Sequence, residues 1–219
     1  KSKGNVVDPL DIVDEYGADT LRTYVLFMGD YGAAAPWNPS SVKGCKRFLD
    51  RVAGLTDMIV DGEVTKELET KFHKAIKKVS ADIEETKFNT AIACLMGLIN
   101  DIYAVGHVTK AEVGTFVKLL SPFAPHLAEE IWEFLGNDTL LAISSWPVYD
   151  EAKTVDDTVE IGVQIKGKVK AVVAIPRNCS KEEAFELAKA DEKIAQILDG
   201  MTIIKEIYVP NKIINFVTK

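Results

Sequence analysis

The spacing of apolar residues changes once along the chain, and this change constrains the fold more than any other feature. Before residue 140, apolar residues recur at every third or fourth position, which is the period of an amphipathic helix. After residue 157 they alternate with polar residues, which is the period of a β-strand with one buried face. The sequence therefore predicts a mainly α-helical bundle followed by a small α+β domain.

Signals for the start of helices divide the first part of the chain. Asp8-Pro9 and Asn38-Pro39 each join an N-cap side chain to a first-turn proline. The first signal predicts a helix that is interrupted at Gly17, and the second predicts a long helix that continues to about Ile59. The helices that follow are expected on the apolar stripes at 68–83 and 92–103, after the capping box of Thr109 and Glu112, and from Pro122 and Pro125 to Gly136.

The second part of the chain is expected to form a β-β-α-β-β domain. Its alternating runs are 159–165, 169–175, 202–209 and 212–217. Lys166-Gly167 and Pro210-Asn211 would form the turns of two hairpins, and a helix capped by Ser180 would continue to about Leu198. The expected organisation is connecting helices within 1–35, the helical bundle over 36–139, a mobile linker over 140–157 and the small domain over 158–219.

Charge is distributed unevenly between the two parts. The chain has 26 basic and 33 acidic residues, which gives a net charge of −7. Residues 1–150 carry 15 basic and 22 acidic residues, whereas residues 151–219 carry 11 of each. This acidic balance argues against indiscriminate binding to nucleic acid, which needs a large positive field, but it allows a local basic stripe.

Several kinds of site are absent from the sequence. The cysteines at 45, 94 and 179 are far apart, which argues against a disulfide scaffold or a structural zinc site. His73, His107 and His126 lie on different predicted helices without partners at metal-ligand spacing. We find no phosphate-binding glycine loop, no nucleophile motif, no secretory signal and no apolar run approaching the roughly 18 residues of a membrane span. No complete active site is therefore expected.

Basic residues gather on one face of the long predicted helix. Lys43, Arg47 and Arg51 are spaced at i, i+4 and i+8, with Lys46 beside them, away from the apolar stripe. Such an array can neutralise successive phosphates of a nucleic acid backbone. The alternative is a solvated helix face paired with Asp50, and the spacing alone favours this alternative.

A second group of lysines flanks the first hairpin turn of the small domain. Lys166, Lys168 and Lys170 belong to this group, and the latter two are expected on the face opposite the apolar residues. They can bind a nucleic acid backbone, or they can protect the edge of a small sheet from pairing with another chain. The spacing supports the two interpretations equally.

The sequence motifs of the N-terminal segment are more specific than the spacing of its apolar and charged residues. K-G-N-x-x-D-P at residues 3–9 and Y-G-A-D-x-L-R at residues 16–22 resemble the segment that leaves the KMSKS loop of class I aminoacyl-tRNA synthetases. Lys1 and Ser2 would be the last two residues of that signature. The resemblance implies that the chain is the C-terminal part of a longer enzyme.

Sequence motifs later in the chain restrict which class I enzymes it resembles. Phe88–Ala93 and Ser121–His126 are similar to the helical anticodon-binding bundle shared by leucyl, valyl, isoleucyl and methionyl enzymes. Val163–Val169 and Ile207–Lys212 resemble the compact C-terminal domain of bacterial-type leucyl-tRNA synthetases, although that family commonly has Asn-Gly and Pro-Gly in the two hairpin turns. The weaker alternatives are a valyl or isoleucyl enzyme, whose C-termini usually differ, and a stand-alone tRNA-binding or scaffolding module without catalytic activity.

The resemblance implies that activity belongs to the longer parent. The parent would activate leucine with ATP and Mg²⁺ and transfer it to tRNA(Leu), and Lys1 with Ser2 would contribute to ATP binding. This chain alone would be catalytically inactive and hold no cofactor, because leucine and ATP would bind to the missing catalytic domain. It is expected to be cytoplasmic, monomeric and independent of membranes.

The resemblance also points to contacts with tRNA. In relatives the bundle lies along the tRNA and the small domain reaches the outer corner of its L shape. The row around Arg47 and Arg51 therefore becomes the favoured backbone contact, followed by the Lys166–Lys170 turn. Arg22 either touches tRNA or forms an ion pair with Asp19. Leucyl enzymes generally do not read the anticodon, so recognition is expected through shape and backbone.

Overall fold

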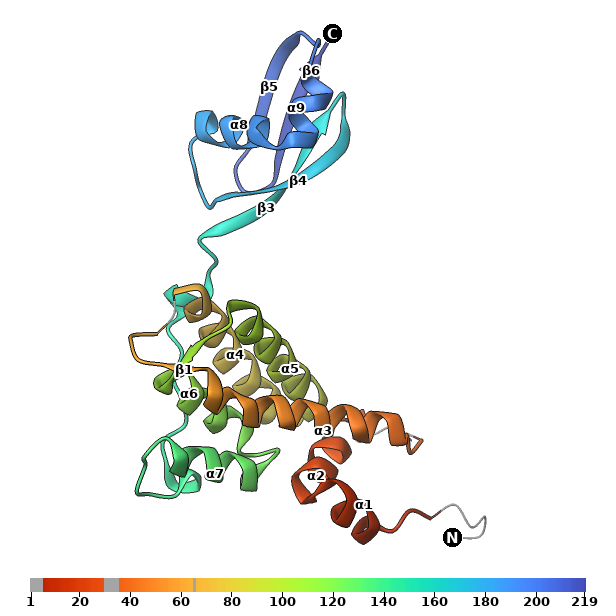
Figure 1. The fold of residues 1–219 in the computed structure, drawn as a ribbon. Helices are drawn as coiled ribbons and strands as arrows, with labels where there is room; N and C mark the ends of the chain where they lie inside the picture. Colours follow the sequence, from red (N-terminus) through yellow and green to blue (C-terminus); the bar gives the residue numbers. More distant parts are fainter. Residues whose placement is uncertain (1–5, 30–35, 65) are drawn as a thin grey trace. The chain divides into compact units, whose positions relative to one another are not determined.

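The structure, a computed structural model, describes residues 6–29, 36–64 and 66–219. The chain divides into two units between Thr154 and Val155. The first unit is built of helices, and the second consists of a sheet with helices on one face (Figure 1). The predicted fold class, a helical bundle followed by a small α+β domain, is confirmed.

Three helices of the first unit begin at the predicted caps. Its elements are α1 (Pro9–Tyr16), α2 (Ala18–Phe27), α3 (Pro39–Ala53), η1 (Gly54–Met58), β1 (Ile59–Val60), α4 (Lys66–Glu84), α5 (Phe88–Val105), β2 (Val108–Thr109), α6 (Lys110–Leu120), α7 (Pro125–Phe134), η2 (Leu141–Ile143) and η3 (Glu151–Thr154). Asp8 and Asn38 cap α1 and α3 by accepting hydrogen bonds from first-turn amides. Thr109 and Glu112 form the predicted capping box of α6.

The prediction that the third helix continues to about Ile59 is wrong. α3 ends at Ala53, where the chain tightens into the 3₁₀ turn η1. The Tyr103 hydroxyl of α5 donates to the Arg51 carbonyl at 3.0 Å, and a Cβ on Gly54 would lie 2.8 Å from that hydroxyl. The turn is therefore fitted closely to α5, and glycine permits this approach.

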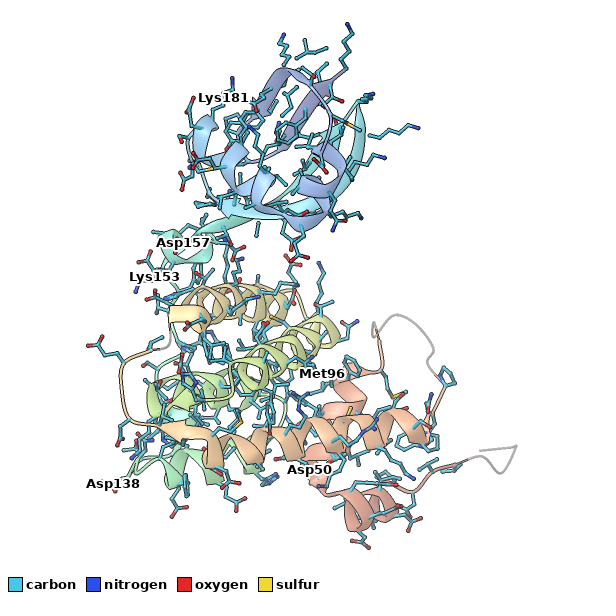
Figure 2. All side chains as sticks on the ribbon, turned by 45° about the horizontal axis from the view of Figure 1, so that its top comes forward. Asp50, Met96, Asp138, Lys153, Asp157 and Lys181 are labelled. Carbon is cyan, nitrogen blue, oxygen red and sulfur yellow. The ribbon has the colours of Figure 1, made fainter. Side chains whose placement is uncertain are left out.

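α5 supplies the centre of the core in the first unit. Its buried residues are Ala91, Ile92, Leu95, Leu98, Ile99 and Ile102. By length and composition this helix is apolar enough to cross a membrane, although Asn89, Asn100 and Asp101 interrupt its apolar residues. Burial among α3, α4 and α6 accounts for this apolar character. Met96, labelled in Figure 2, packs against a smaller cluster formed by Tyr24, Val42 and Cys45 of α2 and α3.

The segment of residues 146–153 is fastened to α4. Its polar contacts join Trp146 to Ser80, Asp150 to His73, Glu151 to Lys77 and Lys153 to Glu69. The hydrogen bond from Lys153 lowers the pKa of the Glu69 carboxyl, and the same bond raises the pKa of Lys153. Most of the range in which the sequence predicts a linker is therefore part of the first unit.

The second unit is a four-stranded sheet covered by two helices. Its elements are β3 (Thr158–Ile165), β4 (Lys168–Pro176), α8 (Lys181–Ala190), α9 (Glu192–Leu198), β5 (Ile203–Val209) and β6 (Ile213–Thr218). The strand order is β4-β3-β6-β5, with β3 and β6 parallel and the two hairpins antiparallel. The helix expected to reach Leu198 is broken at Asp191, whose backbone is extended and whose carboxylate caps α9.

The first hairpin turn places a lysine in a left-handed conformation. Lys166 and Gly167 have φ values of +52° and +76°, so both turn residues have the positive φ that a type I′ turn requires. A lysine in this conformation costs roughly 1 kcal/mol, because its Cβ approaches the following carbonyl, whereas asparagine tolerates it better.

We therefore predict that Lys166→Asn raises the free energy of unfolding of the second unit by about 0.5–1 kcal/mol. Chemical denaturation followed by circular dichroism measures this change. Lys168→Asn is the control, since Lys168 lies in a strand, where asparagine gives no gain. Equal or lower stability of Lys166→Asn would contradict the conformational argument.

Candidate nucleic-acid interface

Two of the four predicted cations on α3 face solvent. Lys43 and Arg47 are exposed, and neither forms an ion pair with any residue that the structure describes. With Tyr16, Ser40 and Lys46 they line an open hollow of about 440 Å³ beside the N-terminal half of α3. Their positive charge is therefore available to an external anion such as a phosphate.

The other two predicted cations on α3 have partners inside the bundle. Lys46 forms an ion pair with Asp50 one turn further along the helix, as the solvated-face alternative expects. The half-buried Arg51 donates from Nη1 to Asn100 Oδ1 at 2.6 Å, and its guanidinium carbon lies 4.3 Å from the centre of the Tyr103 ring. Arg51 thus joins α3 to α5, and this packing fixes the direction of its guanidinium.

Arg22 contacts the turn before α7 rather than Asp19. Its Nη2 donates to the Pro122 carbonyl at 3.2 Å. The Asp19 carboxylate accepts a hydrogen bond from the Leu127 amide at 2.8 Å and lies 2.8 Å from His126 Nδ1. Asp19 occupies this place because free amides and the positive end of the dipole at a helix N-terminus favour a carboxylate. These contacts join the Y-G-A-D-x-L-R segment at residues 16–22 to the S-P-F-A-P-H segment at residues 121–126. We call this set of polar contacts between α2 and α7 the latch.

A β-bulge changes the expected faces of the lysines in the second unit. It leaves Lys170 without a partner in the register and pairs Lys168 with the buried Ile165. The prediction that Lys168 and Lys170 share the face opposite the apolar residues is therefore wrong, and Val169 is 56% exposed. These lysines and Lys166 are exposed beside β4, an edge strand, so backbone binding and edge protection both fit their positions.

The described residues contain no cluster of three or more potential metal ligands. Burial raises the pKa of the Cys45 thiol to about 11 and also raises the pKa of the half-buried Cys94 thiol. Both groups are therefore protonated at neutral pH and are poor nucleophiles. Lys1 and Ser2, the candidate ATP-binding residues, lie outside the described residues.

A further basic row on α4 is missing from the sequence-based candidates. Lys71, Lys74 and Lys78 are spaced at i, i+3 and i+7 and line a groove between α4 and α5. The spacing was the signal that could have identified them. It is obscured because acidic residues near both ends of α4, at positions 67, 69, 82 and 84, make the helix highly charged overall.

Comparisons with known proteins cover the whole chain. The family described as "Anticodon-binding domain of tRNA ligase" matches residues 65–194, and "tRNA synthetases class I (I, L, M and V)" matches residues 1–38. A leucine–tRNA ligase of Alkaliphilus oremlandii (strain OhILAs) is 50% identical over 220 residues, covering 100% of this chain and 27% of the relative. The chain therefore spans about a quarter of the length of this curated relative.

One solved structure is similar over the full chain as well. It is the ternary complex of Agrobacterium radiobacter K84 AgnB2 LeuRS with tRNA and LeuAMS, which is 32% identical to this chain with a TM-score of 0.74. The similarity covers 100% of this chain and 31% of that chain. Both the helical unit and the small mixed unit thus have counterparts in one known protein.

Proposed function

Because the chain belongs to the class I tRNA ligases with an anticodon-binding domain, and among them to the leucine–tRNA ligases, we propose that it holds tRNA(Leu) while the remainder of the enzyme carries out the chemistry. The observation that carries this proposal is the exposed row of Lys43 and Arg47, two cations one helical turn apart without a carboxylate partner among the described residues. Such a row can contact successive phosphates of an RNA strand.

The parent reaction would be activation of leucine by ATP followed by transfer to tRNA(Leu). ATP use follows from membership of the class I ligases, and Lys1 and Ser2 are the residues of this chain proposed to contribute to it. The described residues supply charged contacts and packing, so their proposed role is to position the tRNA. We also propose that the enzyme acts as a monomer in the cytoplasm, as the resemblance implies.

Recognition by this chain is proposed to depend on the tRNA backbone rather than on the anticodon. A row of Lys and Arg side chains contacts phosphates and carries no base-specific information by itself. We therefore expect a tRNA(Leu) variant whose anticodon has been changed to bind the full-length ligase as tightly as wild-type tRNA(Leu) does.

Competition binding against labelled tRNA(Leu) measures the affinities of the variant and the wild-type tRNA. An unrelated tRNA of equal length serves as the reference for nonspecific binding. The chain alone should also give no leucine-dependent pyrophosphate exchange above a blank preparation. A strong dependence on the anticodon would overturn backbone recognition. Exchange by the chain alone would overturn its purely positioning role.

A further inference from the structure

A second cationic surface lies beside α5. The first is the exposed row of Lys43 and Arg47 on α3, which we call the α3 row. The exposed Lys71 and Lys78 and the half-buried Lys74 of α4 face Cys94, Gly97, Leu98 and Asp101 of α5 across a groove of about 340 Å³. α4 and α5 lie side by side along this groove (Figure 1). We call these three lysines the α4 row.

The helices that carry the two basic rows both contact α5. On one side Arg51 of α3 bonds to Asn100, and on the other Lys71 of α4 lies 3.4 Å from Asp101. Asn100 and Asp101 are neighbours in sequence, and Gly97, which lies one turn before Asp101, is exposed. Because packed helix axes lie about 8–10 Å apart, the axes of α3 and α4 where they contact α5 are separated by at most two such spacings, on the order of 16–20 Å.

The floor of the groove beside the α4 row is low at Gly97. Gly97 is exposed, and a Cβ at this position would have no heavy atom within 4 Å, so a side chain there would project into open space. Glycine in the middle of a helix lowers helix stability by about 1 kcal/mol relative to alanine, without any packing requirement here. Its effect is to keep the floor accessible to a large ligand.

The ion pairs of the α4 row differ in how easily a phosphate can replace them. The Lys71–Asp101 pair is about half exposed on both sides, and such pairs contribute little, so Lys71 can exchange its carboxylate for a phosphate. Lys78 is held by the buried carboxylate of Asp82 at 2.5 Å and stays in place. Exchange is therefore expected mainly toward the Lys71 end of the groove.

Resting on the proposed function, we propose that the α4 row contacts the second phosphate strand of a double-stranded RNA stem whose first strand lies on the α3 row. Double-stranded RNA is recognised largely through phosphate and 2′-hydroxyl contacts across its wide, shallow minor groove. Two cationic rows on helices that both contact α5 suit this shape. A single strand would need only one of the rows.

Charge reversal tests the contact directly. In the full-length ligase, Lys71→Glu with Lys74→Glu should lower tRNA(Leu) affinity by roughly 10-fold or more at low salt. Lys78 is retained because the buried Asp82 depends on it. The matched control is Lys110→Glu with Lys118→Glu, which changes net charge equally but lies on α6. Equal affinity of the α4 variant and the control would overturn the proposal.

Two further measurements do not rely on charge. Gly97→Gln should lower tRNA affinity while leaving helix stability unchanged or higher, because the new side chain closes the floor. Bound tRNA should also slow alkylation of Cys94 at mildly alkaline pH, as measured by mass spectrometry of the Cys94 peptide. Unchanged Cys94 reactivity together with normal affinity of Gly97→Gln would overturn the second contact.

These outcomes separate the second contact from the proposed function. If Lys43 and Arg47 variants lose tRNA affinity while the α4 variant and Cys94 alkylation are unaffected, the groove proposal fails and the tRNA-holding function stands. If the wild-type ligase binds tRNA(Leu) no better than an unrelated tRNA, the proposed function itself fails.

Discussion

Reversing the charges of Lys43 and Arg47 to glutamate is expected to weaken the binding of tRNA(Leu) to the full-length ligase by about 100-fold or more. A hydrogen bond to a charged group contributes about 1.5 kcal/mol or more, so the loss of two such bonds corresponds to about 3 kcal/mol. The glutamates add repulsion from the phosphates. Both native side chains are exposed and form no ion pair with another described residue, so the fold should be unaffected.

Two controls separate this effect from a general loss of charge or activity. The Lys110→Glu and Lys118→Glu variant changes net charge equally and should bind tRNA within a few-fold of wild type. Leucine-dependent pyrophosphate exchange, which needs no tRNA, should be unchanged in the Lys43 and Arg47 variant. Equal tRNA affinity in the two double variants would show that the α3 row is only a solvated helix face.

Asp19→Ala is expected to lower the free energy of unfolding of the helical unit by about 2–3 kcal/mol. The buried Asp19 carboxylate accepts the Leu127 amide and contacts His126, so its removal leaves an amide at the N-terminus of α7 without its partner. It also removes a negative charge that the dipole of α7 stabilises. Urea denaturation followed by circular dichroism measures the change.

Asp14→Ala is the matched control for this prediction. Asp14 is exposed on α1, and its removal should change stability by no more than about 0.5 kcal/mol. His126→Ala should cost less than Asp19→Ala, because the His126 side chain is 79% exposed and the bond to the Leu127 amide remains. If Asp19→Ala were no more damaging than Asp14→Ala, the latch would not contribute to holding α2 against α7.

The parts of the fold that depend on local chemistry could be predicted from the sequence. Asp8, Asn38 and Thr109 cap helices because their side chains reach amides two or three residues away, and this reach is visible in the residue order. The change of apolar period likewise separates the helical and sheet units, since burial on one face imposes that period.

Features set by distant partners could not be predicted in this way. α3 ends at Ala53, where Gly54 packs against Tyr103, a residue about fifty positions away. The bulge at Lys170 depends on how β4 pairs with β3, and it shifts the faces that strict alternation predicts. The segment after α7 is irregular in sequence, yet contacts such as that of Trp146 with Ser80 hold it against α4.

The same distinction applies to the candidate site. Helical spacing placed Lys43, Arg47 and Arg51 on one face, but it could not identify the partner of each side chain. In the structure Lys43 and Arg47 are exposed, Lys46 forms an ion pair with Asp50, and Arg51 packs against α5. The pairing of Lys46 with Asp50 is local and is visible in the helical spacing, whereas the engagement of Arg51 depends on residues about fifty positions away.

The salt dependence of tRNA binding tests the central claim most directly, because each phosphate contact releases counterions. Affinity of the full-length ligase for tRNA(Leu) would be measured over a series of salt concentrations, for the wild type and for Lys43→Gln with Arg47→Gln. Two lost phosphate contacts should reduce the slope of log affinity against log salt by about 1.4–1.8. Identical slopes would contradict the claim that this surface holds the tRNA backbone.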